Sequence, residues 1–201
     1  MRTPDPSEEL AAAAALCRAC RRLAREGLIA GRAGNLSRRD EDMVYVTPRG
    51  VNKARLRPAQ VVRTPLARPA DTVPGASVEY RMHRACYVAA AGIGAVVHTH
   101  APALTALGLL GLDLSSIPEA HENAGGVALV PFQPSGSDAL ADVVAHAAAA
   151  GAGVLLLRGH GATAVGRDLD EACDRMSLAE LTARAIVLAR AAGLASEVPG
   201  C

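Results

Sequence analysis

The spacing of hydrophobic residues predicts helices at several places along the chain. Between Ser7 and Arg25 an alanine- and leucine-rich segment starts with a capping-type serine and two glutamates, and it ends just before a glycine. A second helix is expected from Val78, because apolar side chains recur at positions 78, 82, 85 and 89. Residues 168–193 form a long amphipathic segment with Asp168 near the expected N-cap.

Shorter apolar or alternating segments lie between these helices and indicate strands. The segments NLSRR and MVYVT, residues 35–39 and 43–47, flank a polar turn and are typical of a β-hairpin behind a glycine-rich loop. The remaining expected elements, in chain order, are a short strand at 61–64 in a long loop, a strand at 93–102, a helix at 103–112, a strand at 126–132, a capped helix at 135–151 and a strand-turn-strand unit at 153–166.

This alternation of helices and strands predicts an α/β protein with a mainly antiparallel or mixed sheet. We expect residues 1–201 to form a single domain, since 201 residues suffice for one sizeable core. Half of the residues are hydrophobic, but the chain has one Phe, three Tyr and no Trp. Such a core must be packed from Ala, Val and Leu, which suits helices lying close against a sheet.

Composition excludes several classes of function. The formal net charge is +1 and the charged residues are mixed, so we expect neither a nucleic-acid nor an anionic-membrane surface. The start of the chain does not resemble a signal peptide, and no stretch has the roughly 20 uncharged apolar residues of a membrane span. The five cysteines are scattered rather than arranged as a disulfide framework. These features predict a reduced, cytoplasmic protein.

Three histidines stand where predicted strands end. His98 and His100 lie two residues apart, so on a strand both side chains point to the same face, about 7 Å apart along the chain. His160 follows another apolar strand, at a turn bounded by glycines. Imidazoles from two strands that end at one edge of a sheet would converge on a divalent ion such as zinc. An isolated HxH pair is a weak signal, and buried histidines with ordinary hydrogen-bond partners are the alternative.

Two further regions carry candidate chemistry. Glu79 is expected in the first turn of the helix that Ser77 caps, where it either stabilises the helix dipole or acts as a general acid/base or metal ligand beside the histidines. The glycine-rich segment AGRAGNLS is either a plain turn or an anion cradle. Arg49, in the segment TPRG, can clamp a carboxylate or phosphate with its planar guanidinium.

The other histidines and the CxxC pair have simpler interpretations. His83 is expected on the solvated face of its helix and His146 on the protein surface. His121 could approach the site, although its spacing does not require it. Cys17 and Cys20 lack a second pair or a preceding strand, so we interpret them as helix-packing residues rather than a redox site.

The ordered motifs GRAGNLS, TPRG, SVE, HTH and LLRGHG resemble those of the class II aldolase/adducin family, from residue 8 to about residue 190. The resemblance implies a three-layer α/β fold, with a central antiparallel-rich sheet flanked by helices. It also implies homotetramers with C4 symmetry and active sites at the subunit interfaces. The residues it implies are His98, His100 and His160 as ligands of Zn²⁺ (or Mn²⁺ or Fe²⁺), Glu79 as the catalytic residue, and Gly34, Asn35, Arg49, Gly50 and Ser77 as the phosphate site.

The activity implied by this resemblance is metal-dependent retro-aldol cleavage of a small, anionic hydroxy-ketone, such as a phosphorylated sugar, through a metal-stabilised enediolate. Glu79 would move the proton, with a pKa nearer neutrality than that of a free glutamate. The alternatives are a metal-dependent decarboxylase of a β-keto sugar acid, an iron-dependent oxygenase, and a non-catalytic interaction module like that of adducin.

The chain departs from the family pattern in places that concern substrate recognition. Val78 replaces the second serine of the family's SSE motif, which removes one hydroxyl from the expected phosphate site. Arg49 replaces a small residue and adds a full positive charge. The tyrosine that some members contribute from a neighbouring subunit falls near Glu122, in a shortened region.

Overall fold

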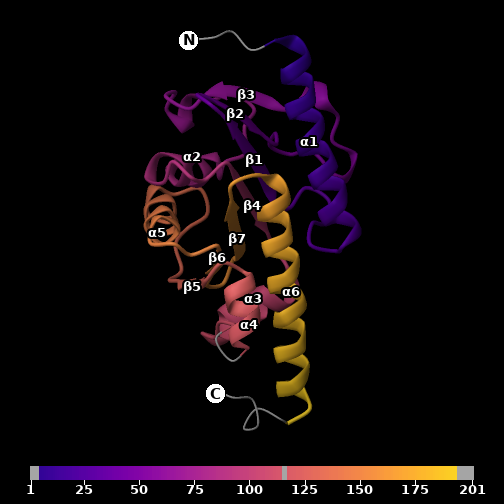
Figure 1. Cartoon of the computed structure of the whole chain (residues 1–201), viewed down its shortest axis with the longest axis vertical. Coiled ribbons are helices and arrows are strands. Elements are labelled where there is room, and N and C mark those ends of the chain that lie inside the picture. The colour runs from indigo at the N-terminus through magenta and orange to yellow at the C-terminus, as the bar shows by residue number, and fades with distance from the viewer. Residues whose placement is uncertain (1–4, 115–116, 194–201) are drawn as a thin grey trace.

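The computed structural model describes residues 5–114 and 117–193, in which a seven-stranded sheet lies between two layers of helices (Figure 1). The strands are β1 (Asn35–Asp40), β2 (Met43–Val46), β3 (Val62–Pro65), β4 (Ala95–Thr99), β5 (Val127–Val130), β6 (Val154–Leu157) and β7 (Gly161–Gly166). The α-helices are α1 (Pro6–Arg25), α2 (Tyr80–Ala89), α3 (Pro102–Leu110), α4 (Pro118–Asn123), α5 (Asp138–Ala149) and α6 (Leu169–Ala191). Three short 3-10 helices cover Lys53–Arg55, Pro58–Gln60 and Ala70–Thr72.

The order of strands in the sheet is β3-β2-β1-β4-β7-β6-β5. Every neighbouring pair is antiparallel except β5 and β6, which run parallel. The predicted α/β class and its mainly antiparallel sheet are therefore confirmed. β4 lies in the middle of the sheet, where Asn35 of β1 is paired with His98 and His98 with Thr163 of β7.

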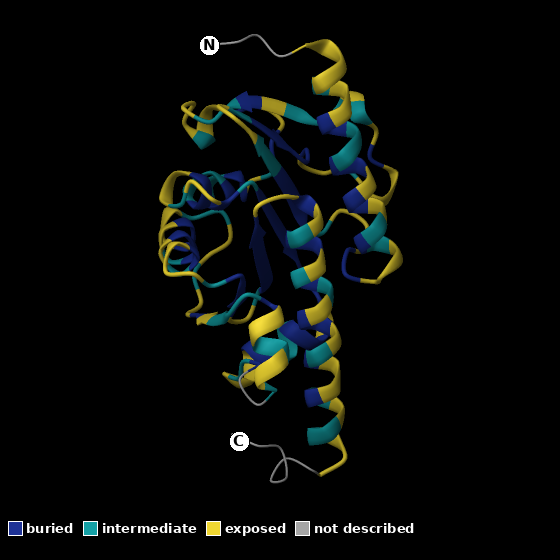
Figure 2. Cartoon of the chain, in the orientation of Figure 1, coloured by how far each residue is buried: buried dark blue, intermediate teal, exposed yellow. Residues whose placement is uncertain are grey.

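Each face of the sheet has its own hydrophobic core. Helices α1, α3 and α6 cover one face, and α2 and α5 cover the other (Figures 1 and 2). Alternation along β4 divides its side chains between them: Ala95 and Val97 belong to the first core and Val96 to the second. His98 is on the same face as Val96 and so points toward α2. This placement brings the first residue of the HTH motif to the helix that follows Glu79.

Two helix starts differ from the sequence prediction. α1 starts at Pro6 rather than at Ser7, because Asp5 accepts a hydrogen bond from the Ser7 N–H (3.0 Å) and the Glu8 side chain accepts from the Asp5 N–H (3.2 Å). α2 starts at Tyr80 with Glu79 as its N-cap, so Glu79 stands before the first helical turn and not within it.

The strand predicted at 93–102 ends earlier, because Pro102 begins α3 and suits the first position of a helix. Helix α4, in the segment where Glu122 lies, is an element that the sequence patterns do not predict. None of the described helices is long and apolar enough to cross a membrane.

Candidate metal centre

His98, His100 and His160 come together at one edge of the sheet, although their positions in the sequence are up to 62 residues apart. Their ring centroids lie 4.8–5.1 Å apart, and one ligand nitrogen from each ring lies within 4.8 Å of the other two. His98 is in β4, His100 follows it directly, and His160 is in the turn between β6 and β7. In the described part of the chain, no other set of three potential ligands converges in this way.

The histidines meet because β4 and β7 are antiparallel neighbours, with Thr99 paired to Ala162. The end of β4 therefore lies beside the start of β7, and hence beside the turn that holds His160. This junction depends on Gly161: a Cβ added there would lie 2.4 Å from the Thr99 carbonyl oxygen and 3.2 Å from the Cα of His100. Only a residue without a side chain fits between these backbone segments.

The site has the chemistry that a divalent cation requires. His98 is fully buried, and its Nδ1 lies 3.2 Å from the Thr163 hydroxyl, which directs the opposite ring nitrogen toward Glu79. Burial lowers the pKa of His98, and it also lowers the pKa of His100, so both rings are neutral near pH 7. Neutral imidazoles are the form that binds metal. Two nitrogens on one zinc ion lie at most about 4.2 Å apart, so the observed spacing is close to what zinc needs.

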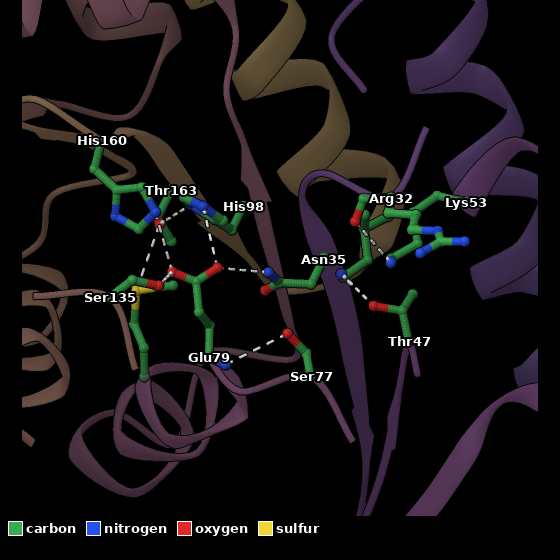
Figure 3. A network of polar contacts seen from close by, with 12 residues as sticks. Arg32, Asn35, Thr47, Lys53, Ser77, Glu79, His98, Ser135, His160 and Thr163 are labelled. Atoms are coloured by element: carbon green, nitrogen blue, oxygen red, sulfur yellow. Dashed lines mark hydrogen bonds and ion pairs between the residues drawn. The ribbon is translucent and has the colours of Figure 1, made fainter. Parts of the chain in front are cut away.

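Glu79 lies against His98 and His160 as a buried carboxylate (Figure 3). Oε2 lies 3.3 Å from His98 Nε2, and Oε1 lies 3.2 Å from His160 Nε2. The amide of Asn35 donates to Oε2 (2.7 Å) and the hydroxyl of Ser135 donates to Oε1 (2.9 Å). Four polar groups from four segments of the chain thus surround one carboxylate.

The pKa of Glu79 is lowered, so the predicted shift of its pKa toward neutrality is wrong for the protein without metal or substrate. Burial raises the pKa, but His98, the Asn35 amide, His160 and the Ser135 hydroxyl together outweigh burial. The carboxylate is therefore ionised near pH 7, with the Asn35 amide and the Ser135 hydroxyl donating to its two oxygens.

The glycine-rich loop places Asn35 beside Glu79. Gly34 has φ +71°, and a Cβ there would lie 2.8 Å from the His98 carbonyl oxygen, so this position requires glycine. The loop is anchored by Lys53, which is 2% exposed and donates to the carbonyl oxygens of Arg32 (3.2 Å), Pro48 (3.3 Å) and Val51 (2.9 Å) (Figure 3). Burial lowers the pKa of Lys53. Lys53 thus ties the glycine-rich loop to the TPRG turn.

The three other residues predicted for anion binding lie next to Glu79 in the chain or at the adjacent turn. The Arg49 N–H donates to the Gly75 carbonyl oxygen (2.9 Å), and the Ser77 hydroxyl accepts from the Glu79 N–H at 3.4 Å. Gly50 is exposed in the same turn as Arg49. The Arg49 side chain is exposed, and its guanidinium has no hydrogen-bond or ion-pair partner among the described residues. The structure therefore brings the turn to the site without bringing Arg49 into contact with the triad.

Ser135 is a contact of Glu79 that the sequence patterns do not predict, and His83 does not lie on the solvated face where its helical position predicts it. The segment SGSD signals a helix cap, and Ser137 is that cap, which leaves Ser135 available to contact Glu79. His83, predicted on a solvated face, is fully buried, and its Nδ1 lies 2.7 Å from the Ser37 hydroxyl. Because α2 packs against both the sheet and α5, its buried face is wider than the apolar spacing indicates.

The remaining candidates agree with their simpler interpretations. His146 is exposed, and His121 contacts the backbone of Val127 rather than the triad. Cys17 and Cys20 are buried free thiols within the α1 packing, and burial raises the pKa of both, for Cys20 to about 12. Cys201 lies outside the described residues.

Comparison with known proteins gives one family. The sequence profile of the "Class II Aldolase and Adducin N-terminal domain" matches residues 14–187. A 5-methylthioribulose-1-phosphate/5-deoxyribulose-1-phosphate aldolase of Rhodospirillum rubrum is 34% identical over 171 residues, which are 83% of this chain and 76% of that protein. A methylthioribulose-1-phosphate dehydratase of a Bradyrhizobium species is 42% identical over 97 residues, 48% of this chain and 44% of that protein. The crystal structure of L-fuculose-1-phosphate aldolase from Thermus thermophilus superimposes with a TM-score of 0.79 at 32% identity, and the match covers 92% of this chain and 96% of that one.

Proposed function

The chain belongs to the class II aldolase and adducin family, and from that premise we propose that it is a divalent-metal-dependent lyase that cleaves a small phosphorylated hydroxy-ketone by retro-aldol chemistry. Two of the proteins it resembles are aldolases named for sugar phosphates. The observation that carries the proposal is the convergence of three imidazoles and one buried carboxylate at a single point.

His98, His100 and His160 are the residues that would hold the metal, for which we propose zinc. When bound, such an ion supplies Lewis-acid polarisation of a substrate carbonyl oxygen. The protein buries one of these ligands, His98, inside the sheet, with its Nδ1 3.2 Å from the Thr163 hydroxyl and its Nε2 3.3 Å from a carboxylate oxygen of Glu79. An interaction module without chemistry would need none of these features, and this distinguishes the proposal from the adducin-like alternative.

Glu79 is proposed as the proton-transfer group. Its carboxylate is ionised near neutral pH and thus able to accept the proton that the hydroxyl on the β carbon loses when the bond between the α and β carbons breaks and its electron pair moves toward the carbonyl group. Asn35 and Ser135 hold both oxygens, which limits rotation of the carboxylate and keeps it directed at the reacting atoms. During cleavage Glu79 then returns the proton to the α carbon, next to the carbonyl group, and in the condensation direction the proton moves the opposite way.

The phosphate of the substrate is proposed to bind where the glycine-rich loop, the TPRG turn and the segment before α2 meet. Lys53 and the isolated bridge between Pro48 and Ala76 hold these segments together. The Arg49 guanidinium supplies a positive charge that no described carboxylate neutralises. The residues proposed for this anion site are Gly34, Asn35, Arg49, Gly50 and Ser77.

A homotetramer with active sites at its subunit interfaces is also proposed. The side chains of Leu109 and Phe132 are 60% and 62% exposed, and they lie 3.9 and 3.6 Å from the position that a Cβ on Gly159 would occupy. Gly159 is the direct neighbour of His160. An exposed apolar patch beside a candidate site supports its burial by a neighbouring subunit.

The proposal is tested by removing and restoring the metal. Purified protein is analysed for metal, stripped with a chelator, reloaded with Zn²⁺, Mn²⁺ or Fe²⁺ and assayed with a panel of phosphorylated and unphosphorylated ketoses. We expect aldehyde release that disappears with the chelator and returns with the ion. Protein that binds no metal, or that cleaves the ketoses equally well without it, contradicts the proposal.

The product identifies the reaction within the family. Dehydration is a second candidate, because one similar protein is named as a dehydratase of a ketose phosphate. Loss of water without aldehyde indicates that reaction, carbon dioxide from a β-keto sugar acid indicates decarboxylation, and oxygen consumption with Fe²⁺ indicates an oxygenase. Each of these outcomes would show that the reaction is not retro-aldol cleavage, but it would not contradict the proposed metal centre.

A further inference from the structure

A line of polar side chains lies buried between α2 and β1, behind the candidate metal centre. Glu79, His83 and Tyr87 are spaced by four residues and therefore share one face of the helix. Asn35 and Ser37 are two residues apart on β1 and share one face of the strand. We call these five residues the α2–β1 polar seam.

Hydrogen bonds connect the two sides of the seam at short range. Asn35 donates to Glu79 (2.7 Å), while the Ser37 hydroxyl lies 2.7 Å from His83 Nδ1 and 2.6 Å from the Tyr87 hydroxyl. None of the five residues is more than 4% exposed, so water does not compete for these contacts. Among the described residues Nε2 of His83 has no hydrogen-bond partner, which leaves Ser37 as the one hydrogen-bonded contact of that ring.

The seam restricts how α2 lies on the sheet. The helix also packs on α5 and the sheet through apolar side chains, and such contacts tolerate small sliding movements because they are not directional. Hydrogen bonds at 2.6–2.7 Å are directional, and a small slide leaves a buried donor or acceptor unpaired at high cost. The hydroxyl of Ser37 therefore connects β1 by hydrogen bonds to two successive turns of α2.

The position of α2 in turn determines the position of Glu79. β1 is paired with β4 so that Asn35 lies opposite His98, which relates the seam directly to the triad. Glu79 is the N-cap of α2, and its oxygens lie 3.2–3.3 Å from two imidazoles. A shift of the helix by about 1 Å would change which of these contacts survive.

We propose that Ser37 and His83 are positioning residues, which hold α2 in the register that presents the Glu79 carboxylate to the histidine triad. They touch neither substrate nor metal, and they act through Glu79. The catalytic part of this inference rests on the proposed function, whereas the structural part, the placement of the carboxylate, does not.

The first test observes Glu79 directly in the metal-free, full-length chain. The side-chain carboxyl ¹³C resonance of Glu79 is identified by its loss in Glu79→Gln and compared between wild type and Ser37→Ala. We expect a clear shift of that resonance in Ser37→Ala. The matched control is Thr64→Val, which removes another buried hydroxyl, on β3, and which is expected to leave the resonance unchanged.

The second test uses turnover of the metal-loaded protein. Ser37→Ala is expected to lower kcat by about tenfold or more, while KM stays within about twofold and the metal content is unchanged. At position 83, Asn retains a polar atom near the position of Nδ1 and Leu retains none. His83→Asn is therefore expected to restore most of the activity that His83→Leu loses.

An unshifted Glu79 resonance in folded Ser37→Ala overturns the proposal. Should that variant fail to fold, Ser37→Cys keeps the side-chain volume and weakens both hydrogen bonds, and an unshifted resonance there has the same meaning. If the wild-type protein cleaves no ketose phosphate, only the proposed function is wrong. The resonance comparison needs no turnover, and it still decides whether the α2–β1 polar seam positions Glu79.

Discussion

Glu79 shows how a few neighbours decide the state of a single buried carboxylate. Burial disfavours the charge, yet Asn35 and Ser135 donate to its two oxygens, and His98 and His160 lie within 3.3 Å. The result is a lowered pKa in a place closed to bulk water. In the proton-transfer role proposed for it, Glu79 would act by being ionised and oriented in advance rather than by being a strong base.

We predict that Glu79→Gln retains metal and lowers kcat by about 10²–10⁴-fold, the usual contribution of a proton-transfer group. The amide keeps the shape of the side chain but cannot accept the proton. Metal analysis and steady-state kinetics on one preparation check both parts, with Glu119→Gln on exposed α4 as the control. Turnover within a few fold of wild type would remove Glu79 from this role.

The buried ring of His83 predicts a loss of stability in acid. Burial lowers its pKa from 6.5 to about 3. Between those values the unfolded chain binds a proton that the folded chain does not, so the free energy of unfolding falls as the pH decreases from about 6.5 toward 3. The slope that one such group contributes is about 1.4 kcal/mol per pH unit within this window, and above it the group contributes no slope.

Urea unfolding of the metal-free protein between about pH 7.5 and pH 5 measures that slope. His98, whose pKa is also lowered by burial, adds to it in the same direction. His83→Asn is expected to reduce the slope, whereas Thr64→Val, which removes a buried hydroxyl but no titratable group, is expected to leave it unchanged. Equal slopes in all three proteins would show that His83 titrates in the folded state as it does in the unfolded chain.

At the level of helices and strands, the candidate site is a property of the junction between β4 and β7. The two strands are central and antiparallel, and their closeness at Thr99 and Gly161 sets the distance between the HTH motif and His160. Two other segments, the glycine-rich loop before β1 and the N-cap of α2, complete the site from the same face. Each segment is short, and the sheet is what holds them in register.

Gly161→Ala is predicted to damage both stability and metal binding. The added methyl group would lie 2.4 Å from the Thr99 carbonyl oxygen, so the β4–β7 junction must open. We expect a lowered melting temperature and a loss of roughly 1–3 kcal/mol in the free energy of unfolding, together with weaker binding of Zn²⁺. Gly92→Ala is the matched control, since nothing lies within 4 Å of its added Cβ. Equal metal affinity in the two variants would contradict this account of the junction.

Across the molecule as a whole, the two faces of the sheet have separate tasks. The core under α1, α3 and α6 is almost entirely apolar, with Glu180 as a buried exception that accepts from the backbone N–H groups of Ala103 and Leu104. The face under α2 carries the buried polar residues of the site and of the seam. One face is therefore mainly an apolar core, whereas the other combines apolar packing with the buried polar residues of the candidate site.

The apolar patch beside His160 predicts self-association. Light scattering of the purified protein is expected to give about four times the 20.5 kDa of one chain. Leu109→Glu places a charge on a side chain of this patch that is 60% exposed, and it is expected to shift the protein toward smaller species without unfolding it. A monomeric wild type, or a tetramer unaffected by this charge, would exclude the patch as an interface.

Local sequence patterns were sufficient to predict most of the elements, the sheet class and the candidate residues Glu79, His98, His100 and His160. These features follow from local periodicity, from the side-chain alternation of strands and from the chemistry of imidazole at strand ends. The order of these residues and their motifs along the chain is what resembles the class II aldolase/adducin family.

Four features are decided only by the tertiary structure: the groups around Glu79, the burial of His83, the anchoring of the loop by Lys53, and the exposure of the Arg49 side chain. Contacts between residues 44 to 56 positions apart, such as those of Glu79 with Asn35 and Ser135, leave no periodic trace in a single sequence. They arise from the packing of α2 and the loop before α5 against the sheet, and packing is a property of the whole chain.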